Sequence, residues 1–143
     1  PIKDNRLCFH KNVSGKYGIF DIAVGECSGQ VNITPTNQEY PINYIVSEGS
    51  QYLIKPLDFF PLKNIAFINI DIYGFEKFVI LGAQSTIEKY RPRIGILVTD
   101  EHQDGHSLYD LLGLMRNMNY KRERSVYYHI NQLPVVYITF YPE

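Results

Sequence analysis

The chain has 143 residues, 45% of them apolar and 20% charged, with a formal net charge of -1. This composition excludes a disordered chain, and the lack of a basic excess argues against a nucleic-acid binder. No apolar run approaches the roughly 18 residues of a membrane span, and the first residues lack the apolar core of a signal peptide. Cys8 and Cys27 do not form a CxxC pair and are predicted to be buried, reduced thiols. The sequence therefore predicts one cytoplasmic domain over residues 1–143 that makes no membrane contact.

The first half of the chain has weaker secondary-structure signals than the second. Residues 3–12 are compatible with a short helix. Residues 17–24 are rich in β-branched and aromatic side chains and predict a strand, which we expect to form a hairpin with a short strand at 30–34 across a serine–glycine turn. Residues 35–50 are polar and predict a loop. An edge strand is expected at 52–57, because the proline inside it limits pairing.

The second half begins with two strongly apolar segments. Residues 64–72 and 93–99 carry almost continuous apolar side chains, the pattern of strands buried on both faces. Between them, a stripe of apolar residues at helical spacing begins at Phe75 and stops before Pro92, and it predicts one helix. A strand, a helix and a second strand in this order form a βαβ unit, so 64–72 and 93–99 should be adjacent and parallel.

The end of the chain predicts a further helix and two strands. A polar loop over 100–106 is followed by Ser107, which we expect to cap an amphipathic helix. Residues 120–128 and 133–141 predict strands joined by a short turn, which makes them an antiparallel pair. The predicted fold class is therefore α/β, with a mostly parallel sheet and an antiparallel pair of C-terminal strands.

Polar groups at the carboxyl ends of the predicted strands are candidates for a ligand site, because open α/β sheets bind ligands there. Asp71 is a charge at the end of an otherwise apolar strand, which is costly unless it meets water, a donor or a ligand. Gly74 permits a tight turn, and Glu76 falls in the first turn of the next helix, where an acid also complements the helix dipole. The other polar strand ends are residues 23–26 and 99–106.

The segment around Asp71 resembles the signature of the FkbM family of S-adenosylmethionine-dependent methyltransferases. The matching residues are Ile68-Asn69-Ile70-Asp71-Ile72-Tyr73-Gly74-Phe75-Glu76, Val79-Ile80-Leu81-Gly82-Ala83 and Tyr90-Arg91-Pro92-Arg93-Ile94. Upstream, the segments similar to the family pattern are Ile22-Ala23-Val24-Gly25-Glu26, with Gly29, and Leu57-Asp58. The resemblance covers most of residues 17–100 and implies a Rossmann-like, three-layer methyltransferase sheet.

The resemblance also implies a function and a set of site residues. It implies methyl transfer from S-adenosylmethionine to an oxygen, with a hydroxyl group of a sugar or small molecule as the acceptor. Asp71 and Glu76 take the catalytic positions, and the cofactor-binding positions on the adenine side are Ala23, Val24 and Gly25. Positions that shape the site or bind the substrate are Tyr73, Gly74, Asp100, Glu101 and His102.

Some residues depart from the family pattern. Tyr73 stands where the family usually has Glu, and Asn69 where it often has Lys. The glycine-rich loop after the first strand and the ribose-binding acid after the second have no counterpart, and Pro1 corresponds to the proline that follows that acid. We therefore expect a C-terminal portion of the domain that lacks the N-terminal βαβ unit. Such a portion should bind S-adenosylmethionine weakly on its own and self-associate through an exposed sheet edge.

Other interpretations remain open. The chain could be a non-catalytic, methyltransferase-like module that binds a protein or a glycan, which the departures favour. It could also be an unrelated α/β nucleotide-binding domain, although no phosphate-binding loop supports this. A divalent metal could bind beside Asp71 through the loop residues Asp100, Glu101, His102, Asp104 and His106. A solvated loop is the simpler interpretation of these residues, since ligands adjacent in sequence cannot all converge on one ion.

Overall fold

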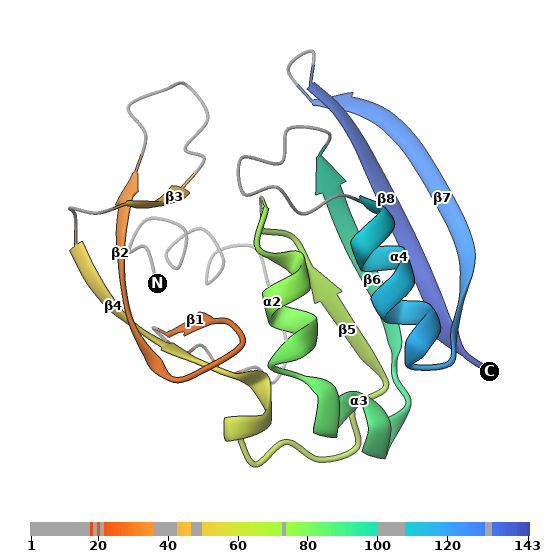
Figure 1. Cartoon of the computed structure of the whole chain (residues 1–143), viewed down its shortest axis with the longest axis horizontal. Helices are drawn as coiled ribbons and strands as arrows, with labels where there is room; N and C mark the ends of the chain where they lie inside the picture. The colour runs from red at the N-terminus through yellow and green to blue at the C-terminus, as the bar shows by residue number, and fades with distance from the viewer. Residues whose placement is uncertain are drawn as a thin grey trace.

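The computed structural model describes residues 18, 20, 22–35, 43–46, 50–72, 74–99, 108–130 and 133–143. Within these residues, the strands form two four-stranded sheets, β1-β4-β2-β3 and β5-β6-β8-β7, and three α-helices pack on the second sheet (Figure 1). In chain order, the elements are β1 (Ala23–Val24), β2 (Gly29–Pro35), β3 (Asn43–Val46), β4 (Ser50–Lys55), the short 3-10 helix η1 (Leu57–Phe59), β5 (Phe67–Ile70), α2 (Glu76–Leu81), α3 (Gln84–Tyr90), β6 (Arg93–Thr99), α4 (Leu108–Asn117), β7 (Tyr120–Ile130) and β8 (Leu133–Pro142). The helix predicted at 3–12, the loop predicted at 100–106 and the capping residue Ser107 lie outside the described residues.

The first sheet differs from the predicted hairpin. Among the described residues of the predicted strand 17–24, only Ala23 and Val24 are in a strand. β1 runs parallel to β4, and β2 runs antiparallel along the other side of β4, so that Ala23 and Gly29 both lie opposite Ile54. The predicted hairpin between β1 and β2 is therefore wrong. The six residues of β4 offer β2 a longer ladder of hydrogen bonds than the two residues of β1 can.

Two further expectations for this sheet are corrected. β4 is not an edge strand, since it lies between β1 and β2. It ends at Lys55, where Pro56 cannot donate a backbone hydrogen bond and leads into η1. The predicted loop 35–50 contains β3, whose residues pair antiparallel with β2. The aromatic and β-branched residues within Asn43–Val46 are the sequence signal that indicates this strand.

The second sheet contains the strand pair that the sequence predicts most clearly. β5 and β6 are adjacent and parallel, with Phe67 opposite Arg93, and α2 and α3 connect them. β7 and β8 form an antiparallel pair, as their short connection predicts. β8 lies between β6 and β7 and is antiparallel to both. The last strand of the chain therefore borders the parallel pair, and β7 lies outside it.

The prediction of a mostly parallel sheet is wrong. Among the described strands, only β1–β4 and β5–β6 pair in parallel, and the other four pairings, β2–β3, β2–β4, β6–β8 and β7–β8, are antiparallel. A parallel pair needs a long crossover, which α2 and α3 supply between β5 and β6. β7 and β8 are separated only by residues 131–132, and such a short connection requires an antiparallel pair. The three-layer arrangement stays a prediction.

β5 is buried on one face only, whereas the sequence predicts burial on both. Ile70 is buried toward the helices, and Ile68 packs against the same core. Phe67 and Asn69, which alternate with them along the strand, are exposed. In β6, by contrast, every residue from Ile94 to Val98 is buried. The difference follows from position, because β5 has one neighbouring strand among the described residues and β6 has two to shelter it.

The single helix predicted from Phe75 is divided into two. α2 ends at Leu81 and α3 begins at Gln84, with the break at Gly82. A Cβ atom on Gly82 would overlap the carbonyl oxygen of Gly25. Glycine at this position therefore lets the end of α2 pack directly on the backbone that follows β1.

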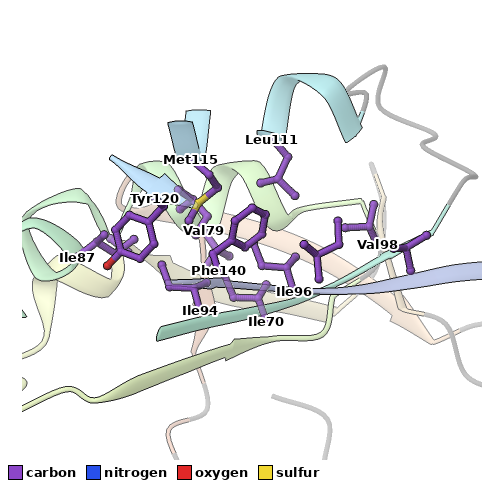
Figure 2. Close-up of a cluster of buried hydrophobic side chains, with 14 residues drawn as sticks. Ile70, Val79, Ile87, Ile94, Ile96, Val98, Leu111, Met115, Tyr120 and Phe140 are labelled. Carbon is purple, nitrogen blue, oxygen red and sulfur yellow. The ribbon is translucent and has the colours of Figure 1, made fainter. Parts of the chain in front are cut away.

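The hydrophobic core lies between the second sheet and its helices (Figure 2). Ile80 of α2, Ile87 of α3 and Met115 of α4 are fully buried against side chains of β6 and β8, such as Ile96 and Phe140. Burial of such side chains contributes about 1.5–3 kcal/mol each, so this cluster anchors the helices on the sheet. None of the helices in the described part of the chain combines the length and the apolar character that a membrane span requires.

Candidate functional site

The candidate site lies where the chain leaves β5. Asp71 directly follows the last residue of β5 and is exposed. Gly74 has a φ of 85°, a left-handed conformation that glycine adopts without steric cost. Glu76 is the first residue of α2. The structure thus places three of the predicted site residues at the carboxyl end of a sheet strand, between β5 and the first residue of α2.

Glu76 is a buried carboxyl group at this turn. The residue is only 4% exposed, and the backbone N–H of Gly74 donates to its Oε1 at 3.1 Å. Burial raises the pKa of Glu76 to about 7, and the charge of Asp71 acts in the same direction, while the backbone N–H groups of Glu76 and Gly74 oppose the increase. Glu76 therefore changes its protonation state near neutral pH.

The two acids of the turn differ in the chemistry open to them. Asp71 is exposed, so its carboxylate can accept a proton from a hydroxyl group bound beside it. Glu76 is enclosed by protein and is engaged by Gly74. Neighbouring carboxyl groups whose environments differ in this way are a recurrent feature of sites that move protons.

The expected cofactor contacts Ala23, Val24 and Gly25 lie at the end of β1, and Gly25 approaches the residue that precedes α2. Gly25 is buried, and its N–H donates to the carbonyl oxygen of Lys55 at 3.1 Å. A Cβ atom on Gly25 would lie 3.6 Å from Cε1 of Phe75, the residue before α2. Ala23 and Val24 are half-buried. The end of β1 and the turn after β5 are therefore neighbours, although they are far apart in the sequence.

The other predicted site residues are not part of the described structure. Tyr73, Asp100, Glu101 and His102 lie outside the described residues. Their roles in shaping the site or binding substrate, and the alternative of a divalent metal, stay predictions.

The prediction of buried thiols is wrong for Cys27. Its side chain is exposed, because it lies in the connection between β1 and β2 rather than in a packed element. Cys8 lies outside the described residues.

Leu57-Asp58 is one of the segments that carry the resemblance. Its Asp58 side chain accepts hydrogen bonds from the start of α3. Oδ2 of Asp58 accepts the N–H of Ser85 at 2.9 Å, and Oδ1 accepts the N–H of Thr86 at 2.8 Å. Burial alone would raise the pKa of Asp58, but the hydrogen bonds from Thr86 and Ser85 lower it below its ordinary value. The sequence does not indicate this contact, because a capping residue is expected directly before its helix, whereas Ser85 lies 27 positions after Asp58.

Tyr90-Arg91-Pro92 joins the end of α3 to the end of α4. α3 ends before Pro92, as the sequence predicts, and the residue that closes it, Arg91, has a left-handed φ of 49°. Its guanidinium donates to the carbonyl oxygens of Met118 and Asn119 at 2.8 and 2.7 Å. The same group lies 4.6 Å from the centre of the Tyr120 ring. This segment therefore has a structural function, because Arg91 donates hydrogen bonds to backbone carbonyl groups at the end of α4.

Asn69 is engaged on the exposed face of the second sheet. The hydroxyl group of Tyr137, on β8, donates to Oδ1 of Asn69 at 2.7 Å. The tyrosine crosses β6 at Gly95, where a Cβ atom would overlap its hydroxyl oxygen. The residue that departs from the family pattern thus joins β5 to β8 across the strand between them.

Comparisons with known proteins bear on the fold. No protein-family model and no curated protein sequence matches the chain. Among solved structures, the chain is similar to the crystal structure of the methyltransferase FkbM from Methylobacillus flagellatus KT, with a TM-score of 0.53 and 18% sequence identity. The match covers 96% of this chain and 30% of that chain, so the chain spans less than a third of its length. This chain therefore has a methyltransferase-like fold.

Proposed function

We propose that this chain is part of an S-adenosylmethionine-dependent O-methyltransferase that acts on a hydroxyl group of a sugar or another small molecule. The observation that carries the proposal is the exposed carboxylate of Asp71 at the carboxyl end of β5, in a fold similar to that of a methyltransferase. This end of a parallel strand is where ligands bind in open α/β sheets. A carboxylate that solvent reaches there is well placed to receive a proton.

The reaction needs an aligned acceptor and a base. When bound, S-adenosylmethionine supplies a methyl group on a positively charged sulfur. Asp71 would take the proton of the acceptor hydroxyl while the hydroxyl oxygen bonds to the methyl carbon and the carbon–sulfur bond breaks. The negative charge of Asp71 also suits the neighbourhood of a sulfonium cation. The turn at Gly74 sets the position of Asp71 relative to α2.

The described residues fit the cofactor in part. Ala23 is a half-buried apolar residue of β1, which suits the face of an adenine ring, whereas Val24 packs against the hydrophobic core. The N–H of Gly25 donates its hydrogen bond to the carbonyl oxygen of Lys55 and cannot also bind an adenine nitrogen. We assign no residue of this chain to the ribose or to the methionine end of the cofactor. We therefore expect weak binding by the chain alone.

Methyl transfer is tested with the full protein that contains these residues. With labelled S-adenosylmethionine and a panel of sugars and small hydroxyl compounds, we expect labelled methyl groups in the acceptor and S-adenosylhomocysteine as the second product. Calorimetric titration of the 143-residue chain should show binding weaker than micromolar. Micromolar binding by the chain would contradict our assignment of the cofactor contacts. Absence of transfer, together with binding of a protein or a glycan, would favour the non-catalytic alternative.

A further inference from the structure

Glu76 occupies a position that suits control of the turn better than contact with an acceptor. The residue is 4% exposed, whereas Asp71 is exposed. Its Oε1 accepts the N–H of Gly74, two residues earlier, at 3.1 Å. This bond ties the first residue of α2 to the turn that follows Asp71.

The residue before α2, Phe75, does not tie the start of the helix to the preceding turn. Phe75 makes no side-chain hydrogen bond at the start of the helix, and its ring packs against Phe78 with a centroid separation of 4.7 Å. Gly74, at a φ of 85°, has no side chain that would restrict its backbone. Glycine can leave this conformation easily, so a hydrogen bond to its N–H has a large influence on the path of the chain.

We propose that Glu76 is a positioning residue, whose carboxylate fixes the Gly74 turn and thereby the placement of Asp71, and that the turn loosens when Glu76 loses its charge. Only the effect on turnover rests on the proposed function. An ionised carboxylate accepts a stronger hydrogen bond from an N–H than a neutral carboxylic acid does. The turn is therefore held more tightly when Glu76 is ionised.

The charges around Glu76 support this role near neutral pH. Burial and the like charge of Asp71 raise the pKa of Glu76 to about 7, so both charge states are populated there. The next residue, Lys77, is directed to Asp110 of α4, with 3.9 Å between Nζ and Oδ2. Among the described residues, Asp71 is the charged group whose field acts on Glu76.

Nuclear magnetic resonance of the full chain with isotope-labelled glycine tests the bond directly. In the wild type, the amide signal of Gly74 should shift with pH, with a midpoint at the pKa of about 7 that we assign to Glu76. In Glu76→Gln, which keeps the shape and an acceptor oxygen, this titration should disappear. In Asp71→Asn, it should persist with a lower midpoint, because the like charge is gone. Glu88→Gln, an exposed acid on α3, is the matched control and should leave the titration unchanged.

The outcomes separate clearly. A Gly74 signal that does not titrate in the wild type, or that titrates equally in Glu76→Gln, overturns the proposal. If Glu76→Gln does not fold, the wild type and Asp71→Asn decide whether Glu76 is the group that titrates. A midpoint of the Gly74 titration that is unshifted in Asp71→Asn contradicts the coupling between the two acids.

Turnover of the full protein gives a second readout. In the wild type, kcat should rise with pH through the Glu76 midpoint. In Glu76→Gln, kcat at alkaline pH should be about fivefold lower, with KM unchanged and the pH-dependent rise absent. A wild-type pH profile in this variant overturns the positioning role. If no methyl transfer is found, the proposed function fails, but the glycine titration still decides whether Glu76 fixes the turn.

Discussion

The starts of α2 and α3 are both held by a carboxyl group that accepts backbone N–H donors, yet the two acids have opposite electrostatic properties. At α2, Glu76 is buried and accepts the N–H of Gly74. At α3, Asp58 is exposed and accepts the N–H groups of Ser85 and Thr86. Burial raises the pKa of Glu76 to about 7. The carboxyl group of Asp58 loses only part of its contact with water, and the hydrogen bonds that it accepts outweigh this desolvation and lower its pKa. The balance between loss of solvent contact and hydrogen bonds from N–H donors decides whether the pKa of a carboxyl group rises or falls.

This difference shows which of the two acids can change its protonation state near neutral pH. Asp58 stays ionised at neutral pH, so its contact with α3 is a constant part of the fold. Glu76 exchanges a proton near neutral pH beside the exposed Asp71. An acidic residue at the start of a helix does not by itself indicate a functional site. A buried acidic residue next to an exposed one is a reason to test for function.

The largest expected effect is on the pH dependence of stability through Glu76. Its pKa is about 7 in the folded chain against an ordinary value of 4.5, so the folded chain binds a proton between these values that the unfolded chain has lost. The wild type should therefore lose about 3 kcal/mol of unfolding free energy through this group as the pH rises across that window. Above the folded pKa, this group should cause no further change. Glu76→Gln should remove the dependence, which urea unfolding at both ends of the window measures.

Glu88→Gln is the control for this comparison. It removes the same formal charge from an exposed position on α3 and should reproduce the wild-type dependence on pH. If Glu76→Gln also follows the wild-type curve, the carboxyl group at the start of α2 is not an unfavourably buried charge, and the contrast with Asp58 disappears.

The next effect concerns turnover through the exposed acid of the same turn. Asp71→Asn keeps the shape of the side chain and removes the proposed base, so kcat of the full protein should fall by roughly 10²-fold. Thermal unfolding of the variant should differ little from the wild type, because an exposed carboxylate contributes little packing. Steady-state kinetics with an accepted substrate measure the first effect. Wild-type turnover, or a variant that does not fold, would contradict a role for Asp71 as the base.

The smallest effect is expected at the start of α3. Asp58→Ala leaves the N–H groups of Ser85 and Thr86 without this acceptor and should cost about 1–2 kcal/mol of unfolding free energy at neutral pH. Asp58→Asn, which keeps one acceptor oxygen, should cost less. Because the folded pKa lies below the ordinary 3.8, the contribution of the ionised group is present above 3.8 and is lost as the pH falls through the lowered value.

Urea unfolding of both Asp58 variants over a range of pH checks this expectation. The difference between Asp58→Ala and the wild type should be constant at neutral pH and decrease in acid. A difference that grows in acid would mean that Asp58 behaves as Glu76 does, and the comparison of the two helix starts would fail.

Local patterns predict much of the second half of the chain. Apolar periodicity indicates α4, β7 and β8, and it indicates the parallel β5–β6 pair with its helical connection. These features depend on residues that are close in the sequence. The first sheet could not be predicted in the same way, because a two-residue β1 has almost no local pattern and its partner β4 is distant along the chain. The division of the helix at Gly82 has the same cause, since it depends on contact with Gly25.

Local patterns in the sequence are sufficient to place Asp71, Gly74 and Glu76 between an apolar strand and a helix, and therefore to predict where a site lies. They do not reveal that Glu76 is buried while Asp71 is exposed, or that Asp58 accepts hydrogen bonds from the start of a helix far along the chain. Solvent access and hydrogen bonds between distant segments arise only when the chain packs. The pKa of a carboxyl group depends on both, so the same side-chain chemistry acquired opposite properties at two neighbouring helix starts.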